Sequence, residues 1–177
     1  MEFNTTYYLK QGTMSMKKWG IIISLFLILV GLGASNLYFK ALQPKRDAEE
    51  QAVQKAKEVY DLKEIISTHT YYGSYTYYIV KAKNKKNEKV IVWVPKNEKK
   101  HDMIVRKESS GISRDKVISI VQKERSPEKI KSIRLAMENE LPMWEVTYID
   151  EKNSFTYYYV DFQTGEFLKR YSMYQTS

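Results

Sequence analysis

The sequence predicts an α+β fold, in which an N-terminal transmembrane helix precedes two tandem modules, each with one helix packed on a curled antiparallel sheet. Three observations predict it: a long uncharged stretch near the N-terminus, strand-like alternation in the remainder, and an order of helix and strands that occurs twice. Of the 177 residues, 43% are hydrophobic, yet the mean hydropathy is −0.52. The apolar residues must therefore be concentrated in part of the chain.

Composition excludes several classes of protein. The 15 tyrosines and 28% charged residues argue against disorder, because aromatic side chains at this density bury enough surface to offset chain entropy. With 7 glycines, 4 prolines and no cysteine, the chain is neither collagen-like nor a disulfide scaffold. The lack of cysteine also excludes thiol catalysis, thiolate zinc sites and a lipid-modified cysteine anchor.

The uncharged stretch, residues 19–39, directly follows Lys17 and Lys18. A helix of this length spans about 30 Å, the thickness of the hydrocarbon core of a bilayer. Aromatic residues at both ends favour an uncleaved transmembrane anchor. The alternative is a cleaved signal peptide, because the most apolar part, residues 21–30, is short and small residues follow it.

The orientation of this anchor is inferred from layout, since the cationic residues near its two ends are equal in number. A short leader that ends in two lysines is typical of a signal anchor that exports its C-terminal part. We therefore expect residues 1–18 to be a cytoplasmic leader and residues 40–177 to be extracellular at the cell membrane. Met14 and Met16 are plausible alternative starts, and residues 1–15 are treated as an uninformative tail.

A first module is expected over residues 45–107. Pro44 should interrupt the membrane helix, and a new helix should begin near Arg46. Its apolar stripe has the spacing of an amphipathic helix: Ala48, Ala52, Val53, Ala56, Val59 and Tyr60. After Lys63 the pattern changes to strand chemistry, in segments 71–80, 89–94 and 103–105.

The same order recurs in a second module, residues 112–175. Ser113 can cap a helix that buries Val117, Ile118 and Val121 and that ends before Pro127. The expected strands are residues 130–137, 144–150, 155–162 and 167–171. Aligning Val94 with Val160 gives an offset of 66, the two helices align at 65, and residues 107–112 form the expected joint.

The segment 157–168 resembles the closing hairpin of PepSY domains, a strand followed by Val-Asp, two variable residues and Thr-Gly. Val160, Asp161, Thr164 and Gly165 fill that pattern. The residues also explain the turn physically, since Asp161 can bond backbone amides and Gly165 can take a positive φ.

The whole layout resembles the TseB-like (YpmB-like) family of Gram-positive membrane proteins, over about residues 16–175. This resemblance implies cystatin-like (PepSY-like) modules and regulation of cell wall elongation by contact with a penicillin-binding transpeptidase. The first module departs from the pattern, because Pro95 and Lys96 stand in the place of the turn residues. An alternative role, implied by the PepSY name, is inhibition or modulation of an extracellular protease.

The sequence contains no catalytic motif, and we expect neither an enzyme nor a bound cofactor. His69 and His101 lie in different segments, without cysteine or a metal-binding spacing near them. Neighbouring carboxylates such as Asp150 and Glu151 act as an acid–base pair only if folding sets them in a cleft. Hydrolysis of wall material is therefore an alternative that would require such a cleft, and a metal site is not expected.

Charge is uneven along the chain. Residues 45–107 have a net charge of +6 and residues 108–177 of −1. The lysines either keep an exposed sheet edge soluble or contact an anionic surface such as lipid headgroups or wall polymer. Nucleic acid is not expected as a partner outside the cell. The candidate contact residues are Lys81, Lys83, Lys85, Lys86, Lys89, Lys96, Lys99 and Lys100.

Tyrosines occupy both faces of two predicted strands, so one helix per module cannot cover them all. The second face is either buried between the modules or exposed to bind a protein, since tyrosine is enriched in interface cores. The candidate partner-binding residues are Tyr75, Tyr77, Tyr157 and Tyr159. The sequence therefore predicts a non-catalytic, membrane-anchored protein that binds and regulates an enzyme of wall synthesis.

Overall fold

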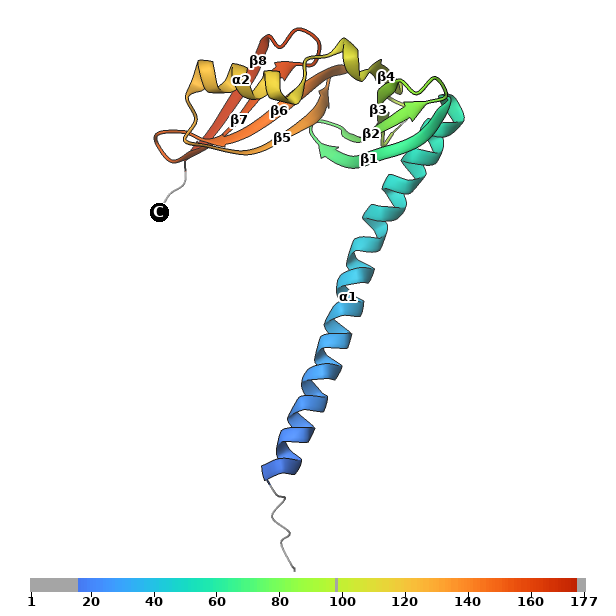
Figure 1. Ribbon diagram of the computed structural model, residues 1–177, viewed down its shortest axis with the longest axis vertical. Helices are drawn as coiled ribbons and strands as arrows, with labels where there is room; N and C mark the ends of the chain where they lie inside the picture. The colour runs from blue at the N-terminus through green and yellow to red at the C-terminus, as the bar shows by residue number, and fades with distance from the viewer. Residues whose placement is uncertain (1–15, 98, 175–177) are drawn as a thin grey trace, which may run out of the picture. The chain divides into compact units, whose positions relative to one another are not determined.

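The computed structural model describes residues 16–97 and 99–174, so the expected tail of residues 1–15 lies outside the described part. The chain forms two compact units, Met1–Arg46 and Asp47–Ser177. Figure 1 labels the helices and strands.

The first unit contains most of helix α1, Met16–Val59. Its large apolar side chains, from Trp19 to Phe39, are exposed. Among the described residues, the helix over Lys18–Val59 is long and apolar enough to cross a membrane, with a mean hydropathy of 2.2 in its most apolar window. Length and composition alone support this, and a signal sequence near the N-terminus has the same properties.

The expected helix break at Pro44 is wrong, because α1 continues through this residue. Proline lacks the N–H that would bond the carbonyl four residues earlier, that of Lys40. Lys40 is exposed, so water can satisfy this carbonyl while the neighbouring helical bonds remain. A single missing bond does not end a helix whose later residues are held by packing.

Four antiparallel strands of the second unit form the first sheet, in the order β1-β2-β3-β4. They are β1 (Leu62–Tyr72), β2 (Thr76–Asn84), β3 (Lys89–Pro95) and β4 (Ile104–Lys107). The end of α1 packs on one face, where Ala52 and Ala56 form a core with Tyr78, Val80 and Val92. Alanine at these positions lets the helix backbone approach the sheet closely.

A 3-10 turn, η1 (Glu108–Ser110), leads to helix α2, Arg114–Arg125. Ser113 caps this helix as expected, since its side chain accepts a hydrogen bond from the Lys116 N–H. The second sheet has the order β5-β6-β7-β8. Its strands are β5 (Lys129–Glu138), β6 (Leu141–Ile149), β7 (Ser154–Asp161) and β8 (Phe167–Tyr174).

One hydrophobic core joins the two sheets. Tyr77, Ile79 and Trp93 of the first sheet belong to the same buried cluster as Val117 of α2 and Val146 of β6. The Trp93 indole Nε1–H donates to the Ala136 carbonyl at 3.0 Å, and its ring meets Phe162 edge-on at 5.5 Å. Each sheet is too small to bury a large core alone, so this joint packing follows from size.

The two sheets also share a register. Tyr78 pairs with Val94 in the first sheet, and Trp144 pairs with Val160 in the second, at the offset of 66 residues expected from the sequence. The turn after β7 has the expected geometry: the Asp161 carboxylate accepts from the Gln163 and Thr164 N–H groups, both at 2.7 Å. Gly165 has a φ of 76°, which favours glycine.

Candidate partner-binding surface and basic connector

The structure separates the four candidate tyrosines by burial. Tyr77 is 1% exposed and Tyr159 7% exposed, and both lie in the shared core, whereas Tyr75 is 44% exposed. Tyr157 is half-buried and packs at the edge of that core. Tyr75 and Tyr157 are therefore the candidates that can reach a partner in this fold.

Tyr159 belongs to a polar network that joins β5, β6 and β7. Its hydroxyl donates to Glu145 Oε2 at 2.8 Å, while Arg134 Nε donates to Glu145 Oε1 at 2.6 Å. Burial, followed by the hydrogen bond to Glu145, raises the pKa of Tyr159 far above its ordinary value. These contacts satisfy a carboxylate that is almost fully buried and show how Tyr159 stabilises the fold.

Sequence reasoning missed Glu145, although the sequence carries a signal for it. A single glutamate interrupts an otherwise apolar run in β6, between Trp144 and Val146. A charged residue inside such a strand requires partners. The position of these partners, Arg134 and Tyr159, depends on strand register, which the sequence pattern did not specify.

An open aromatic surface lies on the face of the second sheet that points away from α2. Tyr158 donates to Glu124 of α2, so the alternate residues of β7 point to the other face. There Phe155 pairs with Met173, and Tyr157 with Tyr171. We call these four residues, Phe155, Tyr157, Tyr171 and Met173, the tyrosine face.

The tyrosine face remains accessible in the second unit. Tyr171 is 56% exposed and Met173 is also exposed, while Phe155 and Tyr157 are half-buried and form an edge-on ring pair at 5.6 Å. Lys169 borders the surface, lying 5.4 Å from the centre of the Tyr171 ring. Exposed aromatic and methionine side chains on a sheet are typical of protein interfaces.

Tyr75 lies elsewhere, in the turn between β1 and β2. Its ring centre is 4.0 Å from that of His101, and His101 Nδ1 lies 3.5 Å from Glu140 Oε1 at the turn between β5 and β6. Within the described part of the chain, no ring contact joins Tyr75 to Tyr157. The candidate tyrosines therefore lie in three places: Tyr157 in the tyrosine face, Tyr75 and Tyr77 beside His101, and Tyr159 in the network of Glu145.

Half of the candidate lysines are paired with acids. Lys83 lies 2.8 Å from Glu64, Lys85 2.5 Å from Asp61 and Lys81 2.9 Å from Glu108. Lys89 also lies near Glu108, at 4.0 Å. The remaining four, which are exposed and have no ion pair with another described residue, are Lys86, Lys96, Lys99 and Lys100.

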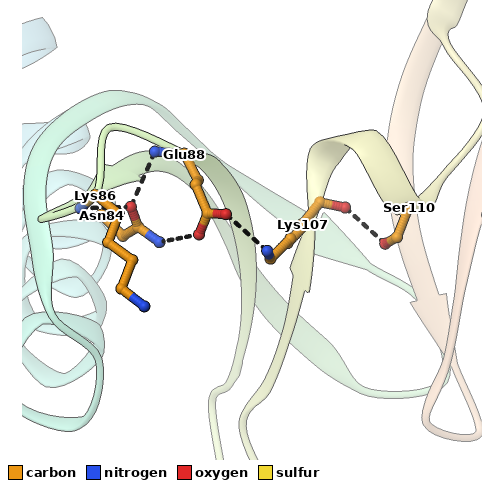
Figure 2. Close-up of polar contacts among 5 residues, drawn as sticks. All are labelled: Asn84, Lys86, Glu88, Lys107 and Ser110. Atoms are coloured by element: carbon orange, nitrogen blue, oxygen red, sulfur yellow. Dashed lines mark hydrogen bonds and ion pairs between the residues drawn. The ribbon is translucent and has the colours of Figure 1, made fainter.

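Polar contacts tie the β2–β3 hairpin to residues 107–112, which we call the connector between the sheets, as Figure 2 shows. Asn84 Oδ1 accepts from the Lys86 and Glu88 N–H groups, each at 2.9 Å. Lys107 Nζ donates to Glu88 at 2.7 Å, and the Ser110 hydroxyl donates to the Lys107 carbonyl. The Lys107 hydrogen bond is the main cause that lowers the pKa of Glu88.

The two histidines are placed apart. His69 Nε2 lies 3.1 Å from the Leu135 carbonyl, whereas His101 lies in the Tyr75 cluster. No group of three histidine, aspartate or glutamate side chains suited to a metal occurs among residues 16–97 and 99–174. The expectations of no metal site and no catalysis remain predictions.

Two family models match parts of this chain and indicate its class of protein. Residues 111–171 match the PepSY family, described as the peptidase propeptide and YPEB domain. Residues 51–95 match the cell wall elongation regulator TseB-like domain. The molecule is therefore an α+β protein with a PepSY domain and a candidate N-terminal membrane helix.

Two relatives then define the family. The chain is 35% identical, over 84% of its length and 92% of the relative, to TseB of Bacillus subtilis (strain 168), described as a probable cell wall elongation regulator. The solved structure of the YpmB protein from Bacillus subtilis matches with a TM-score of 0.67 and 37% identity, covering 70% of this chain and 96% of that chain. This chain belongs to the TseB-like family of cell wall elongation regulators.

Proposed function

We propose that this protein regulates cell wall elongation without catalysis, by contacting a penicillin-binding transpeptidase through the tyrosine face. The observation that carries the proposal is an exposed aromatic surface, Tyr157 with Tyr171 and their neighbours, in a member of a family of elongation regulators. Tyr75 offers a second, smaller contact. Tyr77 and Tyr159 would act indirectly, by holding the two sheets together.

The proposed architecture is a tandem of cystatin-like modules, residues 45–107 and 112–175, outside the membrane. The shared strand order and the register offset of the two sheets support the tandem. Residues 19–39 would form the anchor, with residues 1–18 in the cytoplasm. Because the chain has no cysteine, a Ser119→Cys variant tests this orientation: a membrane-impermeant maleimide should label it in intact cells.

Co-purification tests the transpeptidase contact. We expect the full chain, solubilised from membranes, to retain a penicillin-binding protein that a Tyr157→Ser/Tyr171→Ser variant loses. The matched control is Tyr72→Ser/Tyr174→Ser, since both tyrosines are exposed and lie outside the tyrosine face. Equal retention by both double variants would contradict the proposed surface.

The PepSY match favours a second candidate function, modulation of an extracellular protease, because the family description includes peptidase propeptides. This role predicts that the full chain in detergent slows a secreted protease of its own cell. A lack of effect on every secreted protease, with the transpeptidase retained, would exclude it. A third candidate function is binding of anionic wall polymer or lipid by the lysines that have no ion pair with another described residue, Lys86, Lys96, Lys99 and Lys100, and high salt should abolish it.

A further inference from the structure

A groove of about 580 Å³ lies where the first sheet, the connector and the start of α2 meet. Its volume is in the range of sites that bind small ligands or peptide side chains, roughly 300–1,000 Å³. The apolar part of its lining is formed by Ile112, Trp144 and Phe162. The tyrosine face contributes none of the lining residues, so the groove is a separate site.

Positive charge exceeds negative charge around this groove. Its lining contains the cations Lys81, Lys89, Lys107 and Arg114 and the acids Glu88 and Glu108. Glu88 is engaged by Lys107 at 2.7 Å and by Asn84 at 2.9 Å. Arg114 has no ion pair with any other described residue, so the groove attracts anions.

The Glu108 carboxylate already lies close to two of the cations in the groove lining. It lies 2.9 Å from Lys81 and 4.0 Å from Lys89. Lys81 is partly buried and continues the inward-facing row of Tyr77 and Ile79 on β2. Its ammonium group therefore binds a carboxylate more strongly than a fully hydrated surface lysine would. The position of Glu108 shows that these two lysines can bind a carboxylate.

Trp144 provides an independent sign of a missing partner. Its side chain lines the groove and is 6% exposed, and its buried indole Nε1 has no hydrogen-bond acceptor in the described part of the chain. The comparable donor of Trp93 bonds the Ala136 carbonyl at 3.0 Å. A buried donor without an acceptor is costly, and a ligand oxygen that reached this N–H would remove the cost.

We propose that this groove binds a carboxylate-bearing peptide segment of another protein, which displaces Glu108 from Lys81 and Lys89. The lysines receive the carboxylate, while the apolar lining receives a neighbouring apolar side chain. A phosphate polymer would use the lysines and leave the apolar lining without contacts, so the structure favours the peptide. This site does not depend on the transpeptidase contact.

The test uses the full chain in phosphatidylcholine nanodiscs and the probe acetyl-Leu-Glu-Phe-Glu-Leu-amide. The chain has 3 tryptophans, so its indole N–H signals in NMR spectra are readily resolved and can be assigned with a Trp144→Phe variant. We expect the probe to shift the Trp144 signal more than that of Trp93, whose ring contacts Phe162 of the lining, and to leave the signal of Trp19, which is not part of the lining, in place.

Two ion pairs that each contain a lysine of β2 provide variants for this test. Glu108→Gln should lower the Kd of the probe about fivefold, because it removes the internal competitor, and Lys81→Gln should raise it about fivefold. Glu64→Gln and Lys83→Gln are matched controls, since this pair is also close, at 2.8 Å, and lies outside the groove. We expect the controls to change the Kd less than about twofold.

Three results would overturn the proposal. Equal effects of the Glu108 and Glu64 variants on the Kd would show that general surface charge, and not the groove, determines binding of the probe. A tighter interaction with inorganic polyphosphate than with the peptide would assign the groove to phosphates. An unmoved Trp144 signal, both in the natural chain and in Glu108→Gln, would show that the groove does not bind the peptide. None of these results bears on the transpeptidase contact.

Discussion

Tyr157 and Tyr159 are two positions apart on β7 and point to the same face, yet their surroundings differ completely. Tyr159 lies under the first sheet and bonds the buried Glu145, whereas Tyr157 lies beside the exposed Tyr171. The alternation in the sequence correctly indicates that both residues share a face. It does not indicate where the neighbouring sheet ends, because that boundary depends on contacts between distant segments.

The first prediction compares these two hydroxyl groups. Tyr159→Phe should lower the free energy of unfolding by about 1–3 kcal/mol, because it leaves one oxygen of the buried Glu145 without its donor. Tyr157→Phe should change it by less than about 0.5 kcal/mol. Urea denaturation of the full chain in detergent measures both. Equal losses would contradict the structural role assigned to Tyr159.

The second prediction concerns His69, whose pKa is lowered chiefly by burial. The unfolded chain then binds a proton at a higher pH than the folded chain. The contribution of neutral His69 to the free energy of unfolding should be complete above a pH of about 6.5. It should decrease as the pH falls from that value towards the pKa of the folded state. A His69→Gln variant should lose this part of the pH dependence, measured by urea unfolding between pH 7.5 and 5.5. An unchanged slope would show that other groups cause it.

At the scale of elements, the pattern predicted most strands but failed at Pro44 and at the expected strand 71–80. That segment contains the turn between β1 (Leu62–Tyr72) and β2 (Thr76–Asn84), because Gly73 and Ser74 reverse the chain although tyrosines flank them on both sides. Strand alternation and turn residues are local signals, and the expected segment 130–137 lies within β5 (Lys129–Glu138). Helix continuation at Pro44 depends on the residues beyond it, where Ala52 and Ala56 are held against the sheet. The local rule for proline therefore overestimated the effect of one missing hydrogen bond.

The third prediction tests the start of α2. Ser113→Ala should destabilise the protein by about 1 kcal/mol, since it removes the acceptor of the Lys116 N–H. Ser119→Ala is the matched control: its hydroxyl is exposed and donates to the Asp115 carbonyl within the same helix. We expect a clearly smaller change for this control in the same denaturation experiment. Equal effects would contradict the capping role.

At the scale of the whole second unit, one buried core contains residues of both sheets. The sequence left burial between the modules as one of two alternatives for the second face of the tyrosine-rich strands. It did not identify the residues, because Trp93 and Ala136 come together only when two sheets meet. The groove at the connector was missed for the same reason, since its lining comes from segments that are distant in sequence.

The fourth prediction follows from this shared core. Trp93→Ala should lower stability by about 3–5 kcal/mol and should accelerate hydrogen exchange in both β2 and β7. Mass spectrometry of exchanged, full-length chain measures the two strands separately. Faster exchange in β2 alone would show that the sheets unfold independently.

The central claim is that the tyrosine face contacts a wall-synthesis enzyme, and crosslinking in intact cells tests it most directly. Photoreactive amino acids placed at positions 157 and 171 should capture a penicillin-binding transpeptidase, because these side chains reach the surface. A probe at Ser119, exposed on α2, should not capture it. Capture from position 119 as strongly as from 157 and 171, or capture of no wall-synthesis enzyme at 157 and 171, would contradict the account.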